Sequence, residues 1–585
     1  MSLFEQLKRR NVIRIGTAYL AVAWLLVQIA ETLLPVFEFG PGPIRTLVIV
    51  LAIGFVPVLI LSWLFEITPD GIRRDAEVDH DRPASARHRE RLNQIVIVSL
   101  VLAVSYFAID KFLLSGAVPE AVADEVAIAV MPFVNLSDAE DMVFFSDGVA
   151  EDILGLLSQV TGLRCIARSS SFALRDPDIG AGEIGARLGV THVLTGSLRA
   201  YGEQIRLSVR LVDTATESLV WSDNFDRNLD DVFAIQDEIS RQVVSSISPT
   251  LTAGQSGSSG PENKNDYVDY LRARHLYLRG RDNRSMEQVR DAKAIYEDLL
   301  LGNPNYARAH AGLADVWNYM AIAGEVSVSE GYPRARESAE RALKLDDGVA
   351  EAWYALGDIL VEYYWDQPAA KAAYDRAVEL APQDADGLRG YAYFLRQAGR
   401  PEKALEIYRK AIELDPLSSR AFEGLYRSLL AVGRFDEIDA MIRNATAGMP
   451  DSAAGAAYAF IYEARGEFDE LGELVDSLGP FWGPVFSAYF TAVVERHRGD
   501  VDAGNETIGE IVGMDVSSGV PKHLVVARYY ALFGDFEVAV DYLDAGARAQ
   551  EIGLGEALSD YQFVELRKDP RFWDWVERVG IKPLE

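Results

Sequence analysis

The stretch ADGLRGYAYFLRQAGRPEKALEIYRKAIELDP, residues 385–416, decides the fold of the larger part of this chain. It is typical of a hairpin of two helices, because small residues stand where the helices approach closely and Pro416 ends the second helix. Pro382 and Pro450 lie 34 residues before and after Pro416, so the unit recurs at a fixed spacing. Such hairpins bury their apolar faces only against their neighbours, and the sequence therefore predicts an α-solenoid.

A period of 34 residues is the length of the tetratricopeptide repeat, and the unit resembles that family closely. The neighbouring units match with distortions. The unit that opens at Ala307 carries about nine extra residues between its helices, Tyr426 stands where a small residue is expected, and GPFWGP at 479–484 interrupts the array. We expect about eight hairpins and a C-terminal cap over residues 266–585. The positions that carry the resemblance are Leu388, Tyr391, Ala392, Leu395, Gly399, Ala404, Tyr408, Ala411 and Pro416.

A different pattern fills residues 125–250, where short apolar runs alternate with helix-like segments. The order predicts a compact α/β domain with a mixed sheet, and Ser146 is expected to cap its first helix. Residues 251–265 are rich in Gly and Ser and predict a flexible linker. The candidate strands are EVAIAVMPF from Glu125, LRCIAR from Leu163, THVLTGSLR from Thr191, EQIRLSVRLVD from Glu203 and ESLVWSDNF from Glu217, and the first and last helices are FFSDGVAEDILGLLSQV from Phe144 and LDDVFAIQDEISRQVVSSI from Leu229.

GAGEIG, residues 180–185, spells the G-x-G-x-x-G fingerprint of dinucleotide-binding folds. A true fingerprint needs a hydrophobic strand that enters the first glycine and a helix that leaves the last one. The preceding SFALRDPDI carries two Asp and a Pro and is typical of a turn instead. We therefore interpret GAGEIG as the start of a surface helix and expect no nucleotide cofactor.

The α/β region resembles the TolB-amino-terminal-like, or FlgO-like, domain of bacterial membrane proteins. The resemblance implies that residues 179–189 form a helix on the sheet whose glycines are variable surface positions, and it implies no catalytic residue. The N-terminal hairpin and the C-terminal ending LSDYQFVELRKDPRFWDWVERVGI resemble the same proteins. The matching stretches are AIAVMPFVNLSDAEDMVFFSDGVAEDILGLLSQVTGLRCIARSSSFALR from Ala127, GARLGVTHVLTGSLRAYGEQIRLSVRLVDTATESLVWSDNFDR from Gly185 and LDDVFAIQDEI from Leu229.

Three apolar runs in residues 1–115 predict transmembrane helices at about 12–34, 44–66 and 92–114, because about 20 helical residues cross a bilayer. The third run is weaker, since Asn93, Gln94, Asp110 and Lys111 lie near its ends. A cleaved signal peptide is the alternative for the first run. No small-residue cleavage site follows that run and a second span does, which favours a membrane helix.

The positive charges around these runs predict their orientation. Lys8, Arg9, Arg10 and Arg14 precede the first run, and six arginines between 73 and 91 precede the third. Such segments remain in the cytoplasm, so three passes place the residues after about 115 in the periplasm of a Gram-negative-type cell. If one of the three runs failed to span, the larger part would be cytoplasmic. The first fourteen residues leave no room for a cytoplasmic output domain.

Composition excludes several classes of function. The formal charge is −31, and residues 1–92 hold eleven Lys and Arg against ten Asp and Glu, so the acidity lies beyond residue 92 and disfavours nucleic acid as a partner. Cys165 is the only cysteine, and the seven histidines show no ligand spacing, so we expect no metal site. Ser169, Ser170 and Ser171 lie in no nucleophile elbow, and His192 is typical of a satisfied core residue. We expect no enzyme and no cofactor.

The repeat groove supplies the candidate binding residues. Positions two, five, nine and twelve of a tetratricopeptide unit form the stripe that faces the groove. Guanidinium groups suit bidentate capture of carboxylates, so an acidic or C-terminal peptide is the hypothesised ligand. The alternative is that the arginines only pair along their own helices, as Asp386 with Arg389 and Glu423 with Arg427. The candidates are Arg389, Tyr393, Arg396, Arg420 and Arg427.

Together these features predict a non-enzymatic protein of the bacterial inner membrane that binds a protein partner as a scaffold or sensor. The alternative is a sensor whose α/β domain binds a small molecule or an envelope component and signals through a partner. The sequence leaves the partner, the ligand and the oligomeric state open.

Overall fold

The computed structural model of the chain falls into two compact units, 1–122 and 123–585. In the second unit the structure describes residues 126–137, 142–176, 179–201, 204–228, 231–247, 264–445, 451–479, 482–516, 519–581 and 584, and in the first unit residues 19, 23–24, 51, 65–68 and 71–74.

The described part of the first unit contains a short hairpin. β1 (Phe65–Thr68) pairs antiparallel with β2 (Gly71–Arg74). The predicted spans at 12–34, 44–66 and 92–114 lie almost entirely outside the described residues, and they stay predictions. One boundary is corrected, because Phe65 and Glu66 belong to β1 and not to a membrane helix. Across the part of the chain that the structure describes, no helix combines the length and apolar character needed to cross a bilayer.

The second unit begins with the predicted α/β domain, whose mixed sheet is confirmed. The strand order is β5-β3-β6-β7-β8, with β4 beside β6. β3 pairs in parallel with β5 and β6, whereas β6, β7 and β8 form an antiparallel meander. The strands are β3 (Val126–Val130), β4 (Val134–Asn135), β5 (Leu163–Cys165), β6 (His192–Tyr201), β7 (Gln204–Asp213) and β8 (Leu219–Asn228).

Helices cover both faces of the sheet. Alternate residues of β3 point to opposite faces, so this one strand contributes to two hydrophobic clusters. Ile128 and Val130 belong to the large core under α5 (Val143–Leu157) and α8 (Val232–Ile247), while Ala127 and Ala129 belong to a smaller cluster with α7 (Ala181–Leu188). Ser146 does not cap α5. The helix starts three residues earlier, and the buried Ser146 hydroxyl donates to the Val143 carbonyl at 2.9 Å.

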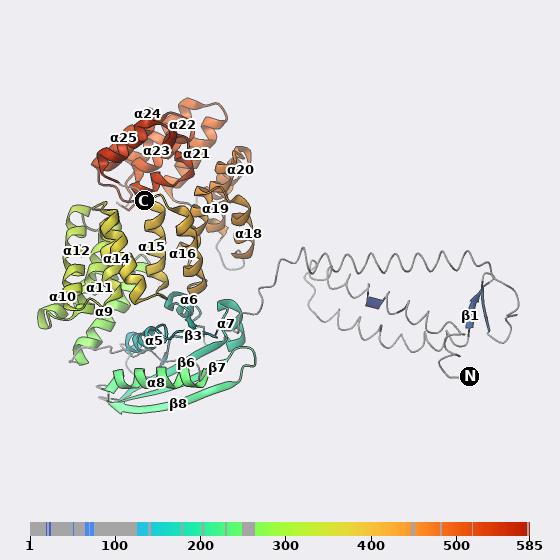
Figure 1. The fold of residues 1–585 in the computed structure, drawn as a ribbon, viewed down its shortest axis with the longest axis vertical. Helices are drawn as coiled ribbons and strands as arrows, with labels where there is room; N and C mark the ends of the chain where they lie inside the picture. The colour runs from blue at the N-terminus through green and yellow to red at the C-terminus, as the bar shows by residue number, and fades with distance from the viewer. Residues whose placement is uncertain are drawn as a thin grey trace. The chain divides into compact units, whose positions relative to one another are not determined.

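The helical repeat array is also confirmed, and its described residues form eight hairpins. Figure 1 shows the paired helices of the array. The inner helices, the first of each hairpin, are α9 (Lys264–Asp282), α11 (Ala307–Ile322), α13 (Ala350–Glu362), α15 (Ala385–Gln397), α17 (Ser419–Ala431), α19 (Asp451–Arg465), α21 (Pro484–His497) and α23 (Lys522–Leu532). The outer helices are α10 (Met286–Gly302), α12 (Val328–Leu345), α14 (Gln367–Leu380), α16 (Pro401–Leu414), α18 (Phe435–Ala445), α20 (Phe468–Leu478), α22 (Val501–Glu510) and α24 (Phe536–Arg548).

The irregular units keep the hairpin architecture. The extra residues after Ala307 lengthen α11 and α12 to 16 and 18 residues, against 13 and 14 in α15 and α16. The array continues across GPFWGP, because α20 ends at Leu478 and α21 begins at Pro484. Tyr426 is buried in the array's core despite its size. The array ends in the 3-10 turns η8 (Leu554–Leu558), η9 (Tyr561–Phe563) and η10 (Leu566–Lys568) and in α25 (Pro570–Val579).

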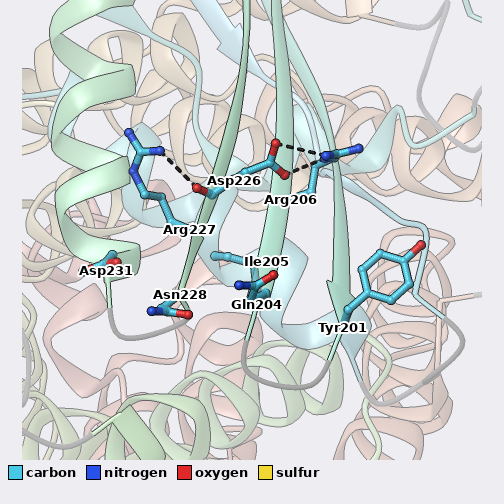
Figure 2. Close-up of a pocket in the computed structure, with 8 residues that line it drawn as sticks. All are labelled: Tyr201, Gln204, Ile205, Arg206, Asp226, Arg227, Asn228 and Asp231. Carbon is cyan, nitrogen blue, oxygen red and sulfur yellow. Dashed lines mark hydrogen bonds and ion pairs between the residues drawn. The ribbon is translucent and has the colours of Figure 1, made fainter.

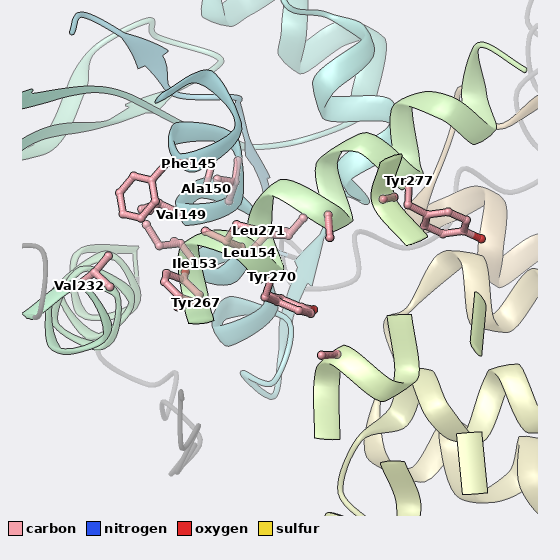
Figure 3. Close-up of a cluster of buried hydrophobic side chains, with 14 of the residues drawn as sticks. Phe145, Val149, Ala150, Ile153, Leu154, Val232, Tyr267, Tyr270, Leu271 and Tyr277 are labelled. Carbon is pink, nitrogen blue, oxygen red and sulfur yellow. The ribbon is translucent and has the colours of Figure 1, made fainter. Parts of the chain in front are cut away.

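The α/β domain and the repeat array share one hydrophobic core. Figure 3 shows α5 packed against α9, with Phe145, Val149 and Ile153 near Tyr267 and Leu271. The approach is close at Gly148, where an added Cβ would lie 2.7 Å from a Leu271 methyl carbon. The first inner helix is therefore buried by the α/β domain on one side and by its own repeat on the other.

Candidate functional site

The candidate site is the inner surface of the array, which is the surface formed by the inner helices. Two other parts of the chain cover its edges. Helices α5 and α6 (Arg168–Ala173) of the α/β domain lie at the N-terminal ends of the inner helices. Residues 551–562, named here the C-terminal segment, cross their C-terminal ends.

Two adjacent acids of α5 bind to arginines of the first two inner helices. The Glu151 carboxylate accepts from Arg274 Nη2 at 2.7 Å, and the Asp152 carboxylate lies 3.3 Å from Arg308 Nη2. Burial would raise the pKa of Glu151, but the charges of Arg274 and Arg168 lower it overall. Glu151 is therefore held as a carboxylate inside the interface.

Polar contacts continue along the connections that precede α15 and α17. The Ser169 hydroxyl donates to Asp415 at 2.7 Å, and the Ser170 hydroxyl donates to the other oxygen of the same carboxylate at 2.5 Å. The Gln383 amide accepts from Cys165 N at 3.0 Å and donates to the Leu163 carbonyl at 2.8 Å. These contacts fix β5 and α6 against the array.

The C-terminal segment places two acids between two buried arginines. Arg396 Nη2 lies 2.5 Å from Glu556 Oε1, and Arg396 Nη1 lies 3.0 Å from Asp560 Oδ1. Arg528 contacts both acids as well, and its Nε donates to Asp560 Oδ2 at 3.0 Å. The Arg396 side chain is 2% exposed and that of Arg528 is 4% exposed. Burial would raise the pKa of Glu556, but the charges of Arg396 and Arg528 lower it to about 2.

Two further acids hold the backbone and the side chains of this segment. Glu362, the last residue of α13, accepts from Gly553 N at 2.9 Å. Glu463 of α19 accepts from the Tyr561 hydroxyl at 2.8 Å and from the Gln562 amide at 3.0 Å. Burial raises the pKa of both carboxyls to about 7. Near neutral pH this end of the inner surface therefore contains carboxyl groups that bind and release protons.

Between the two covered edges lies a group of three arginines, Arg281, Arg389 and Arg420, named here the arginine cluster. Arg281 Nη2 is 3.2 Å and Arg389 Nε is 3.4 Å from the Asp386 carboxylate. Arg420 Nη2 is 3.9 Å from Asp282. The three side chains are 17%, 26% and 48% exposed, so the cluster is partly exposed and Arg420 is its most accessible member.

The charge of the cluster is positive on balance, because three arginines face two aspartates. Burial and the charges of Arg281 and Arg389 lower the pKa of Arg420 below its ordinary value. Burial would raise the pKa of Asp386, but the charges of the three arginines lower it overall. Two half-buried acids nearby, Asp315 and Asp358, have pKa values raised by burial, to about 7 for Asp315.

The structure brings the five predicted binding residues to the inner surface as two groups of two and one separate residue, Arg427. Arg389 and Arg420 belong to the arginine cluster. Arg396 and Tyr393 contact the C-terminal segment, since the Arg396 guanidinium lies 5.3 Å from the Tyr393 ring and Arg396 binds Glu556. Arg427 pairs with Glu423 at 2.9 Å and its guanidinium lies 4.8 Å from the Phe460 ring.

Both helix pairs that the sequence offered as an alternative are present, Asp386 with Arg389 and Glu423 with Arg427. Sequence reasoning missed Arg281 and Arg528. Arg281 lies at the C-terminal end of α9, and the sequence analysis did not assign α9 to a repeat unit by the 34-residue spacing. Arg528 is recognisable only through Glu556 and Asp560, which follow it by about 30 residues and carry no repeat pattern.

The α/β domain has a separate hollow of about 400 Å³ at the end of β6, β7 and β8. Figure 2 shows Arg206 and Asp226 paired across neighbouring strands, at 2.6 and 3.0 Å, above Gln204 and Asn228. The exposed Tyr201 ring lies at one side of it. The lining is mostly polar and charged, and Ile205, Arg227 and Asp231 are its other members.

The remaining sequence candidates have structural explanations. No strand enters GAGEIG, because α6 and a connection precede α7. Gly185 is not a variable surface position, since an added Cβ would lie 2.5 Å from Thr214 Cβ. His192 is half-buried and its Nδ1 lies 2.9 Å from Thr191 Oγ1. Burial raises the pKa of the Cys165 thiol, and no group of acids, histidines and cysteine in the described residues has the geometry of a metal site.

Comparison with protein families identifies two regions. A model of the second domain of HilA/YgeH-like transcriptional regulators matches residues 124–242. A model of the tetratricopeptide repeat matches residues 328–362 and 367–419, which confirms the family of these repeats.

Individual proteins resemble parts of the chain. A Rhizobium meliloti (strain 1021) protein named "Putative adenylate cyclase 3" is 37% identical over 191 residues, so the match spans 32% of this chain and 32% of that protein. Solved structures of PilW, a type IV pilus biogenesis factor, and of YrrB, a tetratricopeptide repeat protein with an unusual peptide-binding site, are each 18% identical. They cover 34% and 40% of this chain and 93% and 95% of their own chains, with TM-scores of 0.29 and 0.21.

Proposed function

We propose that this chain is a non-enzymatic protein that is anchored in a bacterial inner membrane and binds a protein partner on the inner surface of its tetratricopeptide array. Its α/β and repeat regions lie on the periplasmic side, as the charges around the apolar runs favour. The motif residues of the α/β domain support a relation to TolB-amino-terminal-like proteins of the bacterial envelope.

The observation that carries this proposal is the arginine cluster. There, arginines of three inner helices converge, and their side chains remain 17%, 26% and 48% exposed. Tetratricopeptide arrays present such surfaces to peptides and helices. In a chain with a formal charge of −31, a partly exposed group of three arginines is a local exception that favours partners of opposite charge.

Partner recovery tests the proposal. The full chain and its Arg389→Ala/Arg420→Ala variant are used as baits in membrane extracts of the cells that produce it. We expect the variant to lose the recovered partner while its thermal unfolding changes little, because both arginines make exposed or half-buried ion pairs. An equal recovery by the two baits would refute binding at this surface.

The hollow on the α/β domain favours a second function, recognition of a small molecule or envelope component. An exposed tyrosine ring beside amide, carboxylate and guanidinium groups suits a polar ligand with a flat face. Arg227→Ala should then abolish ligand-induced stabilisation of the full chain by envelope extracts, whereas the Arg389→Ala/Arg420→Ala variant should retain it. The reverse pattern would assign the response to the repeat array.

A further inference from the structure

The same chemical arrangement occurs twice at the edges of the inner surface. At one edge Glu151 and Asp152 of α5 are held by Arg274 and Arg308. At the other edge Glu556 and Asp560 are held by Arg396 and Arg528. In both places two carboxylates from outside the inner helices enter the array and meet two arginines that different inner helices contribute.

The arginine cluster resembles these two places in its donors. Among the residues that the structure describes, its ion pairs are all with acids of the inner helices themselves. Its arginines come from three inner helices, α9, α15 and α17. Its closest acids, Asp282 and Asp386, belong to α9 and α15 themselves. Arg420 is the most exposed of the three, and within the described residues its one ion pair, with Asp282, is 3.9 Å long.

We propose that the arginine cluster is a carboxylate-binding subsite, and that an acidic segment of the protein partner docks there as Glu556 and Asp560 dock between Arg396 and Arg528. This inference rests on the proposed function and specifies its partner as an acidic peptide segment. Arg420 provides the bidentate donors, because guanidinium groups bind carboxylates through paired N–H bonds. Arg281 already pairs with Asp282 at 3.3 Å and with Asp386 at 3.2 Å, and it contributes positive charge beside Arg420. Asp386 competes with the incoming acid for Arg281 and Arg389.

The local charge supports this assignment. Burial and the charges of Arg281 and Arg389 lower the pKa of Arg420, as expected where like charges lack a sufficient counterion. An incoming carboxylate relieves that repulsion. A cationic or neutral segment would leave it in place, so charge complementarity selects the acidic partner.

Fluorescently labelled hexaglutamate is a suitable probe, with hexaglutamine as the neutral control. The overall negative charge of the chain repels hexaglutamate, so binding demands a local positive site. We expect the full chain in non-ionic detergent to bind hexaglutamate in preference to hexaglutamine, by fluorescence anisotropy. Arg420→Ala should weaken this binding by at least about fivefold, the loss expected for one charge-assisted hydrogen-bonding partner.

Arg336→Ala is the matched control, because Arg336 is 40% exposed on the outer helix α12 and also pairs with a single acid, Glu340. It should bind hexaglutamate as the unmodified chain does. Asp386→Asn should tighten binding, since it removes the competing carboxylate, and circular dichroism verifies that each variant is folded. Equal weakening by Arg420→Ala and Arg336→Ala, or weaker binding by a folded Asp386→Asn, would overturn the subsite.

The two proposals fail in different ways. If hexaglutamate binding depends on Arg420 but partner recovery does not depend on Arg389 and Arg420, the subsite stands and the proposed function falls. If recovery depends on these arginines but hexaglutamate binds no better than hexaglutamine, the partner is not recognised through acids and this inference falls.

Discussion

At the scale of single residues, burial distinguishes arginines that stabilise the fold from arginines that are accessible to a binding partner. Arg396 is 2% exposed and lies between two acids, whereas Arg420 is 48% exposed with one distant pair. The sequence predicted that both residues face the groove, because both occupy stripe positions of their repeats. The difference comes from the C-terminal segment, about 160 residues away in sequence, which no local pattern near Arg396 indicates.

Replacing Arg396 by alanine should destabilise the fold strongly. The change leaves Glu556 and Asp560 buried with one arginine instead of two, and breaking a buried pair costs about 3–5 kcal/mol. Arg376→Ala, which removes an exposed pair with Glu379 on α14, should change stability by less than about 0.5 kcal/mol. Chemical denaturation measures both, and equal small effects would contradict the structural role of Arg396.

Burial also decides how a glycine responds to substitution by alanine. Gly185→Ala should destabilise the α/β domain by about 1–3 kcal/mol, because the new methyl group would overlap Thr214 at 2.5 Å from its Cβ. Gly509→Ala on the exposed face of α22 meets nothing within 4 Å and should stabilise by up to about 1 kcal/mol through helix propensity. A neutral Gly185→Ala would restore the interpretation of that glycine as a free surface position.

At the scale of elements, the C-terminal segment connects helices that the sequence presents as separate repeats. It contacts α13 through Glu362, α15 through Arg396, α19 through Glu463 and α23 through Arg528. The hairpins themselves were predictable, because their small and large residues recur every 34 positions. The segment was not, since its contacts are long-range and its own conformation consists of short 3-10 turns.

The protonation of Glu463 should make stability depend on pH. Burial raises the pKa of this carboxyl to about 7, so the folded chain binds a proton that the unfolded chain releases near the ordinary value of 4.5. Stability from this group is present below pH 4.5 and is lost as the pH rises through 7, by an amount on the order of 1–3 kcal/mol.

Glu463→Gln keeps an acceptor for Tyr561 and removes the titration. We expect its unfolding free energy to fall less between pH 5 and pH 8 than that of the unmodified chain, by about 1–3 kcal/mol. Glu406→Gln, which removes an exposed carboxylate from α16, is the control for loss of one charge. Parallel pH profiles of the unmodified chain and Glu463→Gln would show that Glu463 is ionised throughout.

At the scale of the whole molecule, sequence reasoning predicted the order of regions better than their assembly. The strands of the α/β domain follow from short apolar runs, and the helix over residues 181–188 was implied by the family resemblance; the structure has both. The flexible linker predicted at residues 251–265 lies almost entirely outside the described residues and stays a prediction. In the structure, a shared core of Phe145, Ile153, Tyr267 and Leu271 joins α5 to α9 in one unit. The sequence did not predict this contact, because the periodicity of apolar side chains shows that a helix face is buried but not which element buries it.

The predicted membrane topology has a direct test. A reporter fused after Gly254 should be active only if that position is periplasmic, because the basic residues before the first and third apolar runs favour the cytoplasm. Removing the third run, residues 92–114, should reverse the result. Cytoplasmic activity of the first fusion would show that one of the three runs does not cross.

The central claim is that a partner binds the inner surface of the array, and site-specific photocrosslinking in living cells tests it most directly. A photoreactive residue replaces Glu423 on inner helix α17 or, as the control, Glu340 on outer helix α12; both side chains are about half exposed and each pairs with an arginine four residues away. We predict an adduct with a partner protein from position 423 that disappears with Arg420→Ala, and none from position 340. Adducts of equal yield from both positions, or an adduct from position 423 that Arg420→Ala leaves unchanged, would contradict the account.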